Sequence, residues 1–94
     1  MLYAAKCYWP QVTAREVEFA AGRAIREAQL ASRAGAPVGY VGSMLFPDDD
    51  LVLCLFESSS ATPVNEANER AGIPCERLMQ SVWLPNPRGE RTRR

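Results

Sequence analysis

The sequence contains no histidine. This absence excludes a Ser-His-Asp or Cys-His catalytic centre, a histidine-ligated zinc site and a haem held by a proximal histidine. No apolar run approaches the ~20 residues of a membrane span, and the first ten residues lack the basic start and long apolar stretch of a secretory signal. We therefore expect a cytoplasmic protein that is not associated with a membrane.

The chain carries no net charge, because it has eleven basic and eleven acidic residues. This balance makes nucleic acid an unlikely partner. The charge is nevertheless uneven, since residues 85–94 contain four arginines and one glutamate beside two prolines. We expect a single domain over residues 1–84, followed by a basic, disordered tail over residues 85–94.

Apolar periodicity and chain breakers predict six elements in the order strand, helix, strand, strand, helix, strand. Two strand–helix–strand halves joined by a hairpin predict a ferredoxin-like α+β sandwich, with two helices on one face of a four-stranded, antiparallel-type sheet. More loosely, this architecture is similar to that of dimeric α+β barrel proteins. The predicted ranges are strands 2–9, 38–46, 51–57 and 77–84, and helices 14–34 and 63–71.

Capping signals mark the start of each predicted helix. Thr13 and Glu16 have the spacing of a capping box, in which each side chain accepts a hydrogen bond from the other residue's backbone amide. Gly35 is expected to end this first helix. The second helix is expected to begin with Thr62 as its N-cap and Pro63 as its first residue.

The face of the sheet away from the helices is expected to be apolar. Side chains alternate between the two faces of a strand, and we place the charged Lys6 and Glu57 on the open face. The same face then receives a set of apolar neighbours, namely Ala4, Tyr8, Leu51, Leu53 and Leu55. Such a face is too apolar for a monomer, which predicts a homodimer with its two sheets face to face. The alternative is that the C-terminal tail folds over it.

The three cysteines, Cys7, Cys54 and Cys75, match no paired-cysteine motif. Strand alternation places Cys7 and Cys54 on the helix-covered face of adjacent strands. There they could form a thiolate pair for a soft metal or a redox bond, or they could serve as small core residues. Cys75 is expected in a loop, either as a ligand, nucleophile or intermolecular disulfide partner, or as an inert thiol.

Several aromatic side chains on the strands could line an apolar pocket for a small molecule, or simply pack in the core and interface. Glu57 and Tyr40 are the candidate catalytic groups. Glu57 would act as a general acid or base in apolar surroundings, or else form a salt bridge with Lys6. Asn68 would bind a ligand carbonyl or tie its helix to a loop. The candidate ligand-binding residues are Tyr8, Trp9, Tyr40, Asn68 and Trp83.

Three segments carry a resemblance in combination: residues 37–43 (PVGYVGS), 54–57 (CLFE) and 65–74 (NEANERAGIP). Together they resemble a family of small actinobacterial ferredoxin-like proteins of unknown function, one branch of which is described as nickel-binding. The resemblance covers about residues 2–84 and implies a ferredoxin-like fold, a dimer and a divalent metal such as nickel. Without histidine, the ligands for such a metal would be Cys7, Cys54, Cys75 or carboxylates.

Three functions are therefore open. The first is metal binding through thiolates and carboxylates. The second is a cofactor-free enzyme or small-molecule-binding protein of the dimeric α+β barrel type. The third is a dimer whose role is interaction or structure alone.

Overall fold

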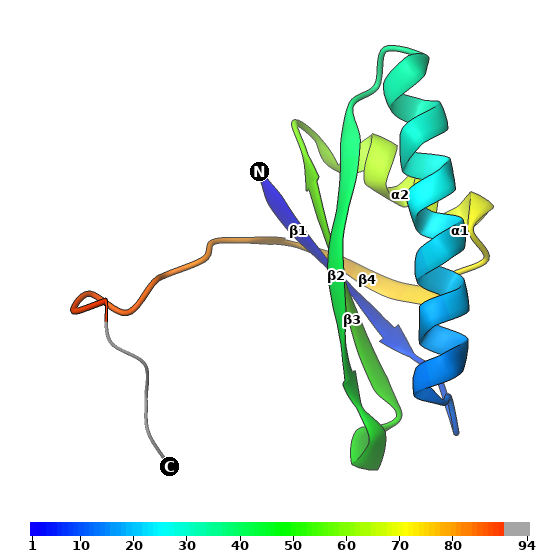
Figure 1. Ribbon diagram of the computed structural model, residues 1–94, viewed down its shortest axis with the longest axis vertical. Helices are drawn as coiled ribbons and strands as arrows, with labels where there is room; N and C mark the ends of the chain where they lie inside the picture. Colours follow the sequence, from blue (N-terminus) through cyan, green and yellow to red (C-terminus); the bar gives the residue numbers. More distant parts are fainter. Residues whose placement is uncertain (90–94) are drawn as a thin grey trace.

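The structure is a computed structural model and describes residues 1–89. The predicted order of elements and the ferredoxin-like α+β fold are confirmed (Figure 1). Residues 90–94 of the expected tail lie outside the described residues. The elements are β1 (Leu2–Tyr8), α1 (Ala14–Arg33), β2 (Val38–Phe46), a short 3₁₀ turn η1 (Pro47–Asp49), β3 (Leu51–Ser58), α2 (Ala61–Arg70) and β4 (Cys75–Ser81).

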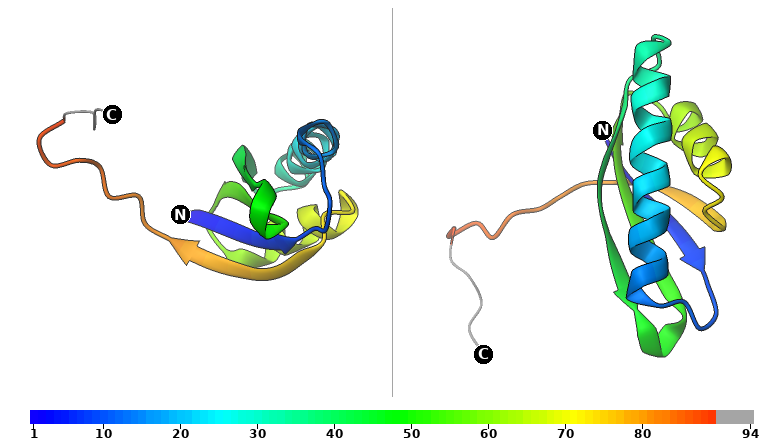
Figure 2. Two further views of the ribbon diagram at one scale, coloured as in Figure 1. Left: turned by 90° about the horizontal axis from the view of Figure 1, so that it is seen from below. Right: turned by 45° about the vertical axis from the view of Figure 1, so that its right-hand side comes forward.

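The four strands form one antiparallel sheet in the order β2-β3-β1-β4. The expected central pair, β1 and β3, is confirmed, and β2 and β4 are the edge strands. Both helices cover the same face of the sheet, and within residues 1–89 no layer covers the other face (Figure 2). None of the helices in residues 1–89 has the length and apolar character needed to cross a membrane.

Small side chains allow α1 to lie close to the sheet. Its buried stripe is Val17, Ala20, Ala24 and Ala28, and Ala24 has no exposed surface. Three alanines in this stripe let the helix backbone approach the strands closely, while Phe56 of β3 fills the space between the layers. The core therefore lies wholly between the sheet and the helices.

The capping box at the start of α1 is confirmed. The backbone amide of Glu16 donates to the Thr13 hydroxyl oxygen at 3.1 Å, and the Thr13 amide donates to the Glu16 carboxylate at 3.0 Å. Gly35, at φ 91°, follows the C-cap residue Ala34, as a helix terminator in the left-handed region should.

The start of α2 differs from the prediction. The helix begins at Ala61 with Ser60 as its N-cap, so Thr62 is not the cap and Pro63 is the third helical residue. The first turn of a helix leaves its amides without intrahelical acceptors, so a proline costs no hydrogen bond at this third position either.

The boundaries of β4 were also predicted wrongly. The strand runs from Cys75 to Ser81, whereas residues 77–84 were expected. Cys75 pairs with Cys7 and therefore lies in the strand, not in a loop. At the other end Ser81 pairs with Leu2, the first residue of β1, so no residue of β1 is left to pair with Val82 or Trp83.

We expect Thr13→Ala to lower the free energy of unfolding by about 1 kcal/mol, because the first turn of α1 loses its side-chain acceptor. Ser60→Ala is the matched control, since Ser60 holds the same cap position in α2 but makes no side-chain capping hydrogen bond. Its effect should be much smaller. Chemical denaturation of both variants measures the difference, and equal losses would contradict the role given to Thr13.

Candidate functional site

The open face of the sheet is apolar in its centre. The register places Leu53 opposite Lys6, and Leu55 opposite Ala4, on the side away from the helices. All the large apolar side chains of this face are at least partly exposed. Among them, Tyr8 exposes 56% of its surface and Met44 exposes 48%. A single protomer therefore leaves a largely apolar surface in water, interrupted by the cations Lys6 and Arg77, which lie opposite each other on β1 and β4.

Glu57 lies at one end of this open face and is exposed. Its carboxylate is 3.5 Å from the N-terminal amine of Met1. The expected ion pair with Lys6 does not form, because Lys6 lies opposite Leu53, four residues from Glu57 along β3. The protomer thus does not give Glu57 the apolar surroundings that a general acid would need.

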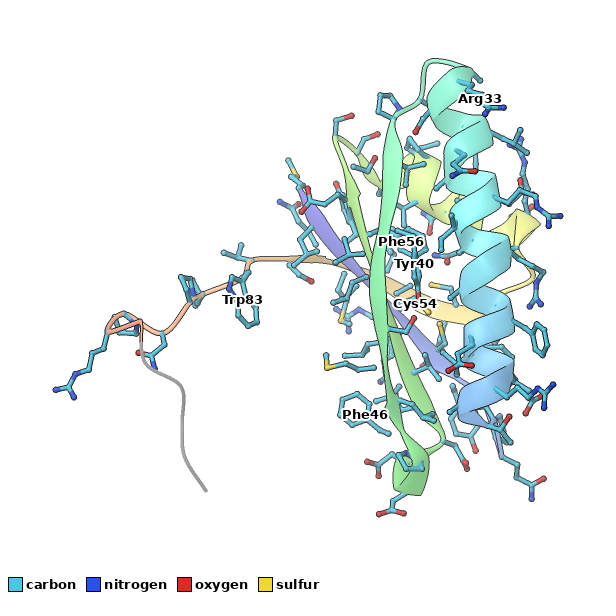
Figure 3. The ribbon with its side chains drawn as sticks, in the orientation of Figure 1. Arg33, Tyr40, Phe46, Cys54, Phe56 and Trp83 are labelled. Atoms are coloured by element: carbon cyan, nitrogen blue, oxygen red, sulfur yellow. The ribbon has the colours of Figure 1, made fainter. Side chains whose placement is uncertain are left out.

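Tyr40 lies on the opposite side of the sheet from Glu57, so the two candidate catalytic groups do not meet. Its ring meets Phe56 edge-on, with the ring centroids 5.4 Å apart. Its hydroxyl is hydrogen-bonded to Ser43, and burial raises the pKa of Tyr40. Figure 3 shows Tyr40, Cys54 and Phe56 on the α1 side of β2, while Phe46 projects on the other side.

The polar groups beneath the helices continue from Tyr40 to two thiols. Ser43 donates a hydrogen bond to Cys54 Sγ at 3.4 Å, and the neighbouring Cys7 thiol donates to the carbonyl oxygen of Ala5 at 3.5 Å. The interaction with the Cys7 thiol lowers the pKa of Cys54 to about 7. The interaction with Cys54, followed by burial, raises the pKa of Cys7. Cys54 is therefore the thiol of the pair that ionises first.

The three thiols share one side of the sheet but do not assemble a metal site in one protomer. Cys7 and Cys54 are buried, and Cys75 is partly buried opposite Cys7. Across residues 1–89, no group of three or more cysteines and carboxylates is placed to hold a metal ion. The donor set within one protomer therefore does not fit a resident nickel ion, which usually takes several nitrogen, sulfur or oxygen ligands.

A groove of about 360 Å³ lies between α2 and the edge strand β4. Its lining comes from the polar α2 residues Asn65, Asn68 and Glu69 and from β4, which contributes the charged Glu76 and Arg77 beside Cys75 and Leu78. Only 2% of the surface of Asn68 is exposed, and neither its Oδ1 nor its Nδ2 has a hydrogen-bond partner among residues 1–89. A buried amide without a partner costs about 1–3 kcal/mol, so Asn68 requires an explanation.

The other candidate ligand-binding residues do not converge on this groove. Tyr8 projects from the open face, and Trp9 packs against the core after β1. Tyr40 lines a separate groove of about 320 Å³ between α1 and β2. Trp83 lies beyond β4 and exposes 77% of its surface. The aromatic residues thus do not form one pocket within the protomer, and of the five candidates only Asn68 lines the α2–β4 groove.

Sequence reasoning singled out Asn68 but missed the groove around it. The groove depends on β4 starting at Cys75, two residues earlier than expected. The available signal was the Gly72–Pro74 stretch, which ends α2 and leaves Cys75 free to enter the sheet at once. An edge strand so close to the end of α2 brings Asn68 and Leu78 to the same opening.

Comparison with known proteins identifies the family. The family model described as "Nickel responsive protein SCO4226-like" matches residues 9–80, which is more than half of the chain. The chain belongs to this family. Its fold is similar to that in the crystal structure of SCO4226 from Streptomyces coelicolor A3(2), with a TM-score of 0.69. The match has 20% sequence identity and covers 89% of this chain and 99% of that one, which shows the shared fold alone. No curated protein matches the sequence.

The thiol pair of Cys7 and Cys54 predicts the pH at which the first thiolate forms. In the reduced protein, one thiolate is expected to form at a pH below that of a free thiol, because the Cys7 thiol beside Cys54 lowers the pKa of Cys54. The far-ultraviolet absorbance of the thiolate, followed through a pH titration, measures it. Cys7→Ala should move this step to higher pH, since burial then acts on Cys54 without the neighbouring thiol. Cys75→Ala, which removes no partner of Cys54, should leave the step in place, and a shift of similar size in both variants would contradict the pairing.

Proposed function

We propose that this protein is a homodimeric small-molecule-binding member of the nickel-responsive family, with its ligand site in the α2–β4 groove. The observation that carries the proposal is Asn68, whose amide oxygen and nitrogen are both buried in the groove wall without partners in the described part of the chain. Buried polar groups in native proteins are nearly always paired. A ligand that supplies the missing partners accounts for an asparagine at this position.

The chemistry of Asn68 narrows the ligand. Its side chain offers one acceptor oxygen and two N–H donors, side by side in one plane. A ligand matches both when it presents a carbonyl oxygen next to an N–H, as a carboxamide or a lactam does. Because both amide atoms are buried in the protomer, binding would require the Asn68 side chain to turn toward the opening. Ile73 and Leu78 line the same groove and supply apolar contacts, as in most small-molecule sites.

The dimer follows from the open face. Half-buried leucines at its centre and exposed Tyr8 and Met44 around them form a surface that water solvates poorly. A second copy placed by a two-fold axis covers this surface with an identical one. The groove lies on the helix side of β4, so the second copy leaves it open.

The nickel response in the family description does not enter this proposal as a resident site. Imidazole is a good ligand for nickel, and this chain contains none. The cysteine thiols of residues 1–89 do not form a set that could hold an ion in one protomer. We therefore propose that the small molecule in the groove, and not a metal held by Cys7, Cys54 and Cys75, is the ligand of the single chain.

Acetamide is a direct probe of the groove, with acetate as the comparison because it lacks the N–H. In the ¹⁵N-labelled protein, acetamide is expected to shift the side-chain NH₂ signals of Asn68 saturably, together with backbone amides of residues 73–78. Acetate should produce much smaller changes. With three asparagines and three glutamines in the chain, the Asn68 pair can be assigned by its loss in Asn68→Leu.

Asn68→Leu is also the control for the acetamide titration. It is close to isosteric and removes an unpartnered amide, so we expect the variant to fold with at least the stability of the wild type. The saturable shifts should disappear in it. Shifts that persist in Asn68→Leu, or an Asn68 signal that acetamide leaves unmoved, would refute the proposed site.

The proposed dimer predicts different oligomeric states for two leucine variants. Leu53→Glu places a charge at the centre of the open face and is expected to give monomers in sedimentation analysis. Leu30→Glu places the same charge on the exposed side of α1 and should leave the dimer intact. A wild-type protein that sediments as a monomer across the accessible concentration range would show that the sheets do not pair.

A further inference from the structure

The chain leaves β4 as an extended, fully exposed apolar segment. We define the C-terminal arm as the three residues Val82, Trp83 and Leu84, of which 77%, 77% and 81% of the surface is exposed. The arm projects away from the domain on the side of the sheet opposite the helices (Figures 1 and 2). A run of three exposed large apolar residues is costly in water unless a partner covers it.

We infer that the C-terminal arm of each protomer crosses to a second copy and packs Trp83 on the open sheet face of that copy. The inference rests on the proposed dimer and adds to it the segment that anchors the two subunits. The arm and the open face are both apolar and lie on the same side of the molecule, so one assembly step would cover both. Tryptophan is also the side chain most often found as an anchor of an interface.

The length of the arm matches the distance that it has to bridge. Three extended residues span about 10 Å at ~3.3 Å per residue. Two sheets packed face to face lie about 10 Å apart. An arm that continues outward from the end of β4 thus reaches the level of the facing sheet by Leu84, where Pro85 ends any further strand pairing.

The residues of the arm favour the partner's sheet over the arm's own sheet. To fold back on its own open face, the chain would have to reverse direction directly after Ser81. Neither glycine nor a turn-forming residue stands between Ser81 and Pro85, and Val82 is β-branched and prefers extended backbone. The arm therefore continues outward toward the second copy.

The two tryptophans of the chain, Trp9 and Trp83, allow the arm to be observed directly. In Trp9→Phe, Trp83 is the single fluorophore. We expect its emission to shift to shorter wavelength as the protein concentration rises through the dimer dissociation constant, which sedimentation measures in the same samples. The double variant Trp9→Phe/Leu53→Glu should keep the long-wavelength emission of a solvated indole at every concentration.

A second measurement keeps Trp9 in place. Trp83→Ser is expected to weaken the dimer by about tenfold or more in dissociation constant, as the loss of an anchoring tryptophan does. Arg88→Ala, a change in the exposed chain beyond the arm, should leave the constant unchanged. Equal constants for Trp83→Ser and the wild type would overturn the inference.

The possible results distinguish a failure of the arm contact from a failure of the dimer itself. A dimer whose Trp83 stays solvated overturns the arm and leaves the paired sheets standing. A monomer with solvated Trp83 overturns both. A monomer whose Trp83 emits at short wavelength at all concentrations shows the arm folded on its own sheet, which also overturns the exchange between copies.

Discussion

The antiparallel pairing of β1 with β3 decides which side chains this molecule buries and which it presents. In that register Ala5 lies opposite Cys54 on the helix side, and Lys6 lies opposite Leu53 on the open side. A slip of β3 by one residue would turn Cys54 to the open face and the leucines of β3 toward α1. The thiol pair and the apolar open face both depend on this one alignment in the centre of the sheet.

Much of this arrangement could be predicted because the signals are local. The capping box of Thr13 and Glu16 is written within four residues, and the alternation along β3 separates Cys54 from Leu53 and Leu55 without any knowledge of neighbours. The edges of the sheet were harder to predict, because they depend on pairing. Where β4 ends is decided by the start of β1, as the Leu2–Ser81 pair shows. Apolar Val82 and Trp83 continue the pattern of a strand after the partner strand has ended.

The candidate site was harder to predict than the fold for a similar reason. Asn68 stands out as a polar residue on a buried helical stripe, but its lack of partners is visible only when β4 is in place. Tyr40 and Glu57 both looked chemically useful, and the pairing of Tyr40 with Phe56 shows that they face opposite sides of the sheet. Composition identifies the groups that can react or bind, whereas strand register decides which of them meet.

Family membership indicates the fold of this chain, whereas its own side chains decide which ligand it can bind. The family model places the chain among nickel-responsive proteins, and the fold agrees with that of SCO4226. The absence of histidine and of a three-donor cluster in residues 1–89 removes the simplest way for one protomer to hold nickel. A shared fold fixes the scaffold, while the ligand depends on the few side chains placed at a site. In this chain the side chain on which the proposed ligand site rests is the amide of Asn68.

The two unsatisfied features of the protomer lie on opposite sides of one sheet. The apolar open face and the C-terminal arm are the features from which we propose a second copy, and the Asn68 groove is the feature from which we propose a small polar ligand. Because the groove opens between α2 and β4 on the helix side, the sheets of the proposed dimer would not close it. Assembly and binding would then compete for no surface, and a substitution that weakens one would leave the residues of the other in place. Any influence of the ligand on the dimer would have to pass through β4, the strand that lines the groove and continues into the arm.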